Sequence, residues 1–299
     1  MNVRDAFFNS VYNKVQNGSD ILIVSSDLGA PSLDKFRCDF PQRFVNVGIA
    51  EQNSIAVAAG LSLAGKIAIT YGLNPFPVTR GFDHIRNIMA SLKIPITVAG
   101  LKAGTATAEA GFSHIVLENM SILRTLHNIQ IVNPSDETIS HMLVEEILAA
   151  NKPRYVEFDP FIRDKLYDVH EVNFSRGFIT SERNNKIAVI SYGIWAHKLK
   201  KSELKIKLID CFSLPIDKEA FVSEIRDCDK IITIEDSIDM GGIGSMTLEI
   251  LNDHDLNIPV KRMSLKFTNG YPSKFTDRED IFKNEGLTIE NLKREIGVE

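Results

Sequence analysis

The chain has 299 residues, of which 44% are hydrophobic and 24% charged, and its 34 basic and 39 acidic side chains give a net charge of −5. This length predicts about two domains, and the charge balance excludes a dominant polyphosphate-binding surface and gives no reason to expect nucleic acid as a partner. The three cysteines are scattered, and no run approaches the roughly 18 apolar residues of a membrane span, so we expect a cytoplasmic protein without disulfides or a membrane partner.

Strands and helices are predicted to alternate along the first half of the chain. Apolar residues spaced four apart from Val3 to Val15 predict a helix that ends near Gly18. Strands are expected at 21–24, 44–47, 67–71, 96–98, 129–132 and 155–158, and helices at 51–63, 82–93, 117–127 and 136–150. This alternation predicts an α/β fold with a layered, mainly parallel sheet.

The alternation of predicted strands and helices stops at residues 159–185, where proline, charged residues and asparagine occur together. We therefore place a domain boundary near residue 165 and predict two layered domains, over residues 1–165 and 166–299, the second a smaller α/β unit. In the second domain, strands are expected at 187–190, 205–209, 231–234 and 260–265, and helices near 195, at 217–226 and 244–252, and around 280 and 288.

Two glycine-containing stretches match phosphate-binding loops only in part. Residues 60–66 are followed by Ile67 in place of the Ser or Thr that holds magnesium, so a helix end capped by glycine is favoured there. Residues 241–245 lack the full Gly-x-Gly-x-x-Gly spacing. A glycine turn is the default at that position, with anion binding by its amides as the alternative.

Four segments place polar or aromatic residues where predicted strands end or helices begin: 25–29, 46–53, 74–76 and 110–114. The carboxyl ends of parallel strands share one edge of the sheet, where ligands bind. We therefore expect Asp27, Glu51 and Phe76 to face one crevice, in which the ring would stack on a flat nitrogen heterocycle and the carboxylate would share a proton with a ring nitrogen. Position alone explains Glu51 equally well as a first-turn glutamate that stabilises a helix dipole.

The chain resembles the C-terminal half of transketolases from about residue 3 to residue 297. The resemblance is carried by PQRFVNVGIAEQNSIAV at 41–57, FDHIRN at 82–87, GFSH at 111–114 and SIDMGGIGS at 237–245. It implies a pyrimidine-binding (PYR) domain over residues 1–165 and a transketolase-type C-terminal domain over residues 166–299. It also implies thiamine diphosphate as the cofactor and transfer of a two-carbon ketol unit between sugars.

The resemblance assigns cofactor-binding roles to five residues. Glu51 matches the catalytic glutamate that hydrogen-bonds N1′ of the aminopyrimidine and thereby promotes deprotonation of the thiazolium carbon, and Ile49 belongs to the same motif. Phe76 matches the residue that stacks on the aminopyrimidine, and Phe82 is a second candidate whose alternative is a place in the core. Asp27 resembles an aspartate near the thiazolium, and its alternative is a turn or helix-capping residue.

Four further residues are candidates for substrate contact. His114, expected with Glu51 to be catalytic, matches a histidine that hydrogen-bonds the donor carbonyl or hydroxyl, and its alternative is a capping role. Lys102 stands where the family usually has a second histidine; it either binds an anion or extends into solvent. His84 and Arg80 complete the predicted substrate-binding set.

Other departures from the family pattern concern the substrate. Ala110 replaces a carboxylate ahead of His114, and Asp159 stands where the family often has a phosphate-binding arginine, with Arg163 nearby. Removing a polar interaction from a site changes substrate preference by roughly 1–3 kcal/mol. These changes argue against a standard pentose-phosphate substrate.

No Gly-Asp-Gly sequence occurs in the chain. In the family this motif, with a following Asn, binds magnesium and diphosphate in an N-terminal domain. We therefore expect a split enzyme in which a partner subunit carries the diphosphate and Mg²⁺ while this chain supplies Glu51 and Phe76 across the interface and no metal ligand. Two copies of each subunit are expected to form a heterotetramer.

Three other functions stay open. The pair of subunits could decarboxylate a 2-oxoacid and transfer the acyl group to a carbonyl acceptor. The chain could be the β subunit of a 2-oxoacid dehydrogenase, although residues 48–52 resemble transketolase more closely. A non-enzymatic scaffold or regulatory subunit with the same fold is the last alternative.

Overall fold

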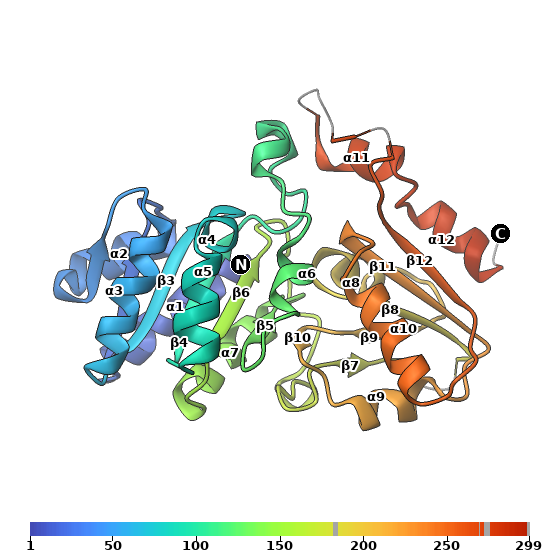
Figure 1. Ribbon diagram of the computed structural model, residues 1–299, viewed down its shortest axis with the longest axis horizontal. Helices are drawn as coiled ribbons and strands as arrows, with labels where there is room; N and C mark the ends of the chain where they lie inside the picture. The colour runs from blue at the N-terminus through green and yellow to red at the C-terminus, as the bar shows by residue number, and fades with distance from the viewer. Residues whose placement is uncertain (182–184, 269, 272–275, 298–299) are drawn as a thin grey trace.

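Two β-sheets flanked by helices lie side by side in the computed structural model, which describes residues 1–181, 185–268, 270–271 and 276–297 (Figure 1). The first sheet has seven strands and the second has five. The predicted α/β class with two layered units is confirmed. Within the described residues, no helix is both long and apolar enough to span a bilayer.

The seven-stranded sheet has the strand order β10-β5-β6-β4-β3-β1-β2. Its strands are β1 (Ile21–Ser25), β2 (Phe44–Asn46), β3 (Ile67–Leu73), β4 (Ile96–Leu101), β5 (Gln130–Val132), β6 (Arg154–Phe158) and β10 (Ser213–Leu214). All pairs are parallel except β10 with β5, which is antiparallel. Because β10 comes from the second half of the chain, the two halves share this sheet, and the boundary near residue 165 remains a prediction.

Helices cover both faces of this sheet. They are α1 (Val3–Gln16), α2 (Pro31–Asp39), α3 (Glu51–Leu63), α4 (Phe76–Thr79), α5 (Phe82–His84), α6 (Asn119–Leu123) and α7 (Glu137–Ala149). The large apolar side chains buried on α1, α2 and α7 belong to one cluster, and the buried apolar residues of α3 belong to the other. The predicted helix at 51–63 is confirmed, whereas 82–93 is divided into α5 and a π-helical segment, Ile85–Ser91.

The five-stranded sheet has the order β12-β11-β8-β9-β7. Its strands are β7 (Ile179–Thr180), β8 (Ile187–Ser191), β9 (Lys207–Asp210), β11 (Lys230–Ile238) and β12 (Val260–Leu265), and its helices are α8 (Gly193–Lys200), α9 (Lys218–Ile225), α10 (Ile243–Asp253), α11 (Arg278–Asn284) and α12 (Ile289–Ile296). Only β7 runs antiparallel to its neighbour. Trp195 on α8 packs against Phe282 on α11, with ring centroids 5.0 Å apart.

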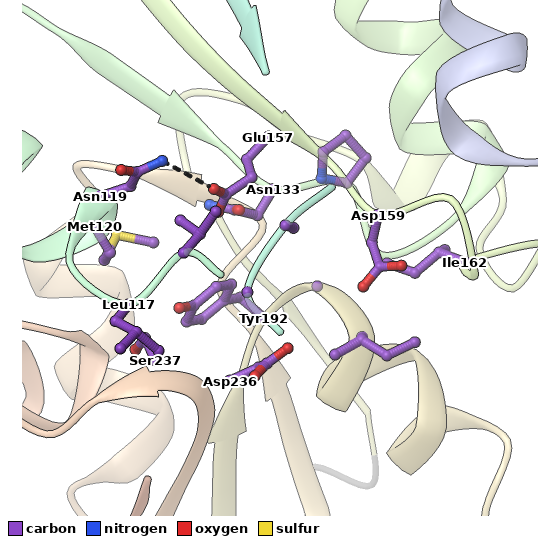
Figure 2. Close-up of a pocket in the computed structure, with 16 residues that line it drawn as sticks. Leu117, Asn119, Met120, Asn133, Glu157, Asp159, Ile162, Tyr192, Asp236 and Ser237 are labelled. Carbon is purple, nitrogen blue, oxygen red and sulfur yellow. Dashed lines mark hydrogen bonds between the residues drawn. The ribbon is translucent and has the colours of Figure 1, made fainter. Parts of the chain in front are cut away.

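A buried group of charges joins the two halves of the chain. Arg278, the first residue of α11 and only 9% exposed, lies 2.7 Å from a carboxylate oxygen of Asp159 and 3.1 Å from one of Asp236. It also donates to the carbonyl of Ala103 at 2.9 Å, while Asp236 accepts the backbone N–H of Thr105. Figure 2 shows Asp159 and Asp236 lining one pocket at this boundary. The loop after β4 is therefore held by residues of the second half.

Replacing Arg278 with leucine should destabilise the fold. The change leaves two buried carboxylates without their cation, which typically costs about 3–5 kcal/mol. The free energy of unfolding in urea measures the effect.

Lys218→Leu is the matched control, because Lys218 forms an ion pair with Asp253 in which both side chains are more than half exposed. Such a pair contributes at most about 1 kcal/mol. Equal losses in the two variants would contradict a structural role for the buried cluster.

Candidate functional site

Glu51 is the first residue of α3, and its side chain is only 5% exposed. The chain reaches it through a tight turn after β2, in which Gly48 has a φ of 73° and donates its N–H to the side chain of Asn46 at 2.9 Å. A carboxylate at this position faces the positive end of the helix dipole. Arg80 Nη1 donates to both of its oxygens, at 3.2 and 3.5 Å.

Phe76 begins α4, and only Asn74 and Pro75 separate it from the end of β3. Its half-buried ring contacts Arg80 on one face, where the guanidinium carbon lies 4.3 Å from the ring centroid. The ring of His114 meets it edge-on, with centroids 5.3 Å apart and planes at 85°. Glu51, Arg80, Phe76 and His114 thus form one continuous row of contacts, the site row.

A buried polar network supports the segment ahead of Phe76. The side chain of Asn74 is fully buried, donates to Glu157 at 3.2 Å and accepts the hydroxyl of Tyr155 at 3.0 Å. Asn119 also donates to Glu157, as Figure 2 shows. Gly100 makes room for this network, since a Cβ there would lie 2.0 Å from Asn74 Oδ1. Burial raises the pKa of Glu157 from 4.5 to about 7, although hydrogen bonds from Tyr155 and Asn119 oppose the shift.

Glu157 should make stability depend on pH. Its folded pKa lies above its unfolded value, so the stabilisation from its bound proton is complete below about pH 4.5 and is lost as the pH rises towards 7. Relative to Glu157→Gln, the wild type should lose about 2 kcal/mol of unfolding free energy between about pH 5.5 and about pH 8. Urea unfolding across this range measures the difference, and parallel pH profiles for the two proteins would show that Glu157 is ionised throughout.

The loop between β4 and α6 carries Lys102, another of the predicted substrate-binding residues. Lys102, which has a φ of 71°, forms an ion pair with Glu109 at 3.1 Å. Phe112 is exposed beside His114, and its ring stacks on Tyr271 with centroids 6.3 Å apart. Lys102 is thus already paired with a carboxylate of its own loop.

The other predicted site residues lie outside the site row. Asp27 is exposed after β1, has a φ of 56° and accepts a hydrogen bond from Asn46 at 3.0 Å. Ile49 is 74% exposed, two residues before Glu51. Phe82 and His84 bound the short helix α5, and His84 Nδ1 is buried without a hydrogen-bond partner in the described part of the chain. No group of three or more His, Cys, Asp or Glu among the described residues could hold a metal ion.

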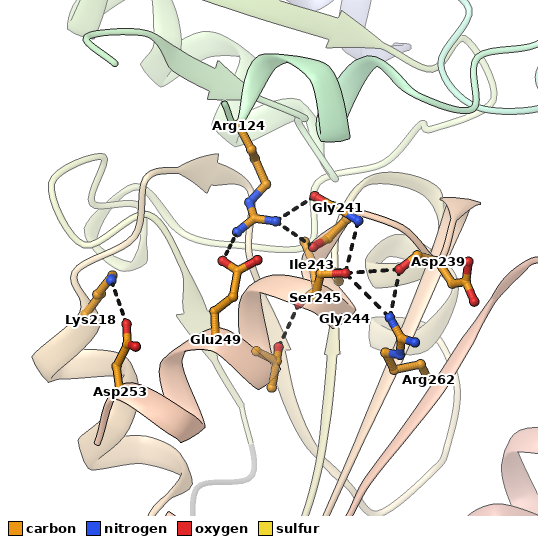
Figure 3. Close-up of polar contacts among 12 residues, drawn as sticks. Arg124, Lys218, Asp239, Gly241, Ile243, Gly244, Ser245, Glu249, Asp253 and Arg262 are labelled. Atoms are coloured by element: carbon orange, nitrogen blue, oxygen red, sulfur yellow. Dashed lines mark hydrogen bonds and ion pairs between the residues drawn. The ribbon is translucent and has the colours of Figure 1, made fainter. Parts of the chain in front are cut away.

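In the glycine-rich turn at 241–245, the two amides that begin α10 are already bound within the chain. Glu235 accepts the N–H groups of Ile243 and Gly244 at 3.0 Å each. The carbonyls of Gly241 and Gly242 accept hydrogen bonds from Arg124, which also pairs with Glu249 (Figure 3). The turn therefore joins α10 to α6, and the alternative of anion binding is wrong for the amides that begin α10.

The donors and acceptors of the site row fit a flat, nitrogen-containing ring. The guanidinium of Arg80 contacts both a buried carboxylate, to which it donates, and an aromatic face, over which its carbon lies. An aminopyrimidine that donates to the same carboxylate offers the same two interactions. The sequence did not reveal this arrangement, although a spacing of four residues between Phe76 and Arg80 is compatible with it.

Family models match both parts of the chain. Residues 1–159 match the transketolase pyrimidine-binding domain, and residues 179–289 match the transketolase C-terminal domain. Among curated relatives, one of the subunits of apulose-4-phosphate transketolase from Actinobacillus succinogenes is 27% identical over 93% of this chain and 92% of its own length. A putative transketolase C-terminal section from Methanocaldococcus jannaschii is 26% identical over 93% of this chain and 89% of its own. A 1-deoxy-D-xylulose-5-phosphate synthase from Halothermothrix orenii is 29% identical, over 78% of this chain and 38% of that protein.

Solved structures agree with these matches. The structure of a split-gene transketolase, described as an inactive beta4 tetramer, superposes with a TM-score of 0.81 and 27% identity, covering 98% of this chain and 95% of the other. Transketolase from Campylobacter jejuni shares the fold, with a TM-score of 0.77 at 16% identity over 99% of this chain and 46% of its own. These matches confirm the resemblance found in the sequence. They also confirm the prediction that the chain is part of a transketolase-like transferase. The chain belongs to the transketolase family.

Proposed function

We propose that this chain is the C-terminal subunit of a split transketolase and transfers a two-carbon ketol unit between sugars with thiamine diphosphate. The observation that carries the proposal is the buried carboxylate of Glu51, which lies in one row with the ring of Phe76 and the imidazole of His114. Similarity along nearly the whole chain to a relative that is named as a single subunit of a transketolase supports the same conclusion.

Each residue of the site row has a task in this proposal. Thiamine diphosphate, when bound, supplies the nucleophilic carbon and the electron sink for the transfer. Glu51 accepts a hydrogen bond from the aminopyrimidine, and its burial shields that bond from water. Phe76 provides the stacking face. His114, whose ring contacts Phe76, is placed to hydrogen-bond a substrate carbonyl or hydroxyl beside the cofactor.

A partner subunit completes the site in this proposal. The chain contains no Gly-Asp-Gly sequence, and relatives of similar length are named as individual subunits of a transketolase. The partner would bind the diphosphate and Mg²⁺, and two copies of each subunit would form a heterotetramer. A cytoplasmic location and a role in carbohydrate metabolism belong to the same proposal.

The substrate-binding residues also remain proposals. Lys102 and His84 lie on segments that flank the site row, and Arg80 lies within it. Asp159, at the position of a family phosphate-binding arginine, is buried and paired with Arg278. An aspartate at this position cannot bind a phosphate as the family's arginine does. This favours a substrate whose anionic group is bound elsewhere.

Replacing Glu51 with glutamine in the complex with the partner should lower turnover at least about 100-fold. Glutamine keeps the size of the side chain but cannot hold the negative charge. Steady-state turnover at saturating cofactor measures the loss. Glu145→Gln is the control, because Glu145 is exposed and pairs with Lys14 on the surface. Full turnover of the Glu51 variant would identify the chain as a scaffold or regulatory subunit.

The purified chain should be inactive alone and should gain turnover when mixed with the partner subunit. A ketose donor should then support transfer without release of carbon dioxide, since no carboxylate is lost in ketol transfer. Product formation and carbon dioxide are measured with a ketose or a 2-oxoacid as the donor. Activity without the partner would refute the split arrangement. Release of carbon dioxide from the 2-oxoacid, without any reaction of the ketose, would indicate decarboxylating acyl transfer. A requirement for lipoyl protein would indicate a 2-oxoacid dehydrogenase.

A further inference from the structure

Arg80 contacts both residues that are proposed to bind the pyrimidine, Phe76 and Glu51. Its backbone N–H donates to the carbonyl of Phe76 at 3.0 Å, so Arg80, which caps the C-terminal end of α4, lies one helical turn from Phe76. Its guanidinium carbon lies 4.3 Å from the Phe76 ring centroid. The same guanidinium donates through Nη1 to both carboxylate oxygens of Glu51.

These are the two contacts that an aminopyrimidine would make. The guanidinium is planar, carries in-plane N–H donors and stacks on aromatic faces. A pyrimidine ring that donates to Glu51 and stacks on Phe76 needs the same space beside the same carboxylate. The side chain of Arg80 and the ring therefore exclude each other.

Exposure shows which of the two partners can move. The side chain of Arg80 is 52% exposed, whereas that of Glu51 is 5% exposed. Thr79 beside it is also exposed, so the arginine borders on solvent and can leave the site row without disturbing the core. Glu51 stays fixed at the start of α3.

We propose that Arg80 is a placeholder that occupies the pyrimidine site of the cofactor-free chain and is displaced when thiamine diphosphate binds. This inference rests on the proposed function of Glu51 and Phe76. The guanidinium neutralises a buried carboxylate that has no other side-chain partner among the described residues, and it thereby lowers cofactor affinity. Cofactor affinity is thus set by competition with a side chain of the same subunit.

Arg80→Met in the complex with the partner tests the proposal. Methionine keeps an apolar chain over the ring but removes the charge and the donors. Without the competitor, the dissociation constant of thiamine diphosphate, measured by isothermal titration calorimetry at saturating Mg²⁺, should fall about 3- to 30-fold. Arg80→Lys keeps a cation without the planar group and should fall between the wild type and Arg80→Met.

Arg37→Met is the matched control. Arg37 also pairs with a carboxylate, that of Asp34, and lies over a ring, that of Phe44, but it is outside the site row. This variant should bind the cofactor like the wild type. In a Glu51→Gln background, Arg80→Met should change the affinity much less, because the ion pair is already weakened.

The outcomes separate the two proposals. Tighter binding by Arg80→Met, absent in the Glu51→Gln background, supports the placeholder. Equal or weaker binding by Arg80→Met and Arg80→Lys, in complexes that melt like the wild type, overturns it and leaves the proposed function intact. A wild-type complex that does not bind thiamine diphosphate contradicts the proposed function itself.

Discussion

The carboxylate of Glu51 is buried at the start of α3, and this constraint organises the proposed site. A buried charge is stable only when it is paired or hydrogen-bonded. The helix dipole stabilises part of the negative charge of Glu51. Its carboxylate also accepts hydrogen bonds from Arg80, whose side chain is half exposed. A donor that arrives from outside can replace such a partner. The geometry therefore suits a site that exchanges one planar donor for another.

The rest of the fold positions the two segments that carry Phe76 and His114. The network around Glu157 supports the segment before Phe76, and Arg278 with Asp236 holds the loop that follows β4. Arg278 and Asp236 belong to the C-terminal half of the chain, and β10 of that half pairs with β5. The second half thus positions the loop that leads to His114, although none of its residues belongs to the site row.

Sequence patterns predicted the elements but only part of the site. Runs of apolar residues predicted most of the strands, although β7 and β10 were missed, and Glu51–Leu63 was placed correctly because it is rich in alanine and ends before Gly65. Segment 82–93 was wrong as one regular helix, and the helix predicted at 117–127 is shorter in the structure, where α6 spans Asn119–Leu123. The position of Arg80 and the Glu157 network depend on side-chain placement across strands distant in sequence, which no local pattern encodes.

The crystal structure of the complex of both subunits with thiamine diphosphate tests the account most directly. We expect an aminopyrimidine nitrogen within about 2.6–3.2 Å of the Glu51 carboxylate, the pyrimidine ring stacked on Phe76, and the guanidinium of Arg80 turned out of that space. A cofactor bound elsewhere, with Glu51 still paired to Arg80, would contradict the role assigned to the buried carboxylate.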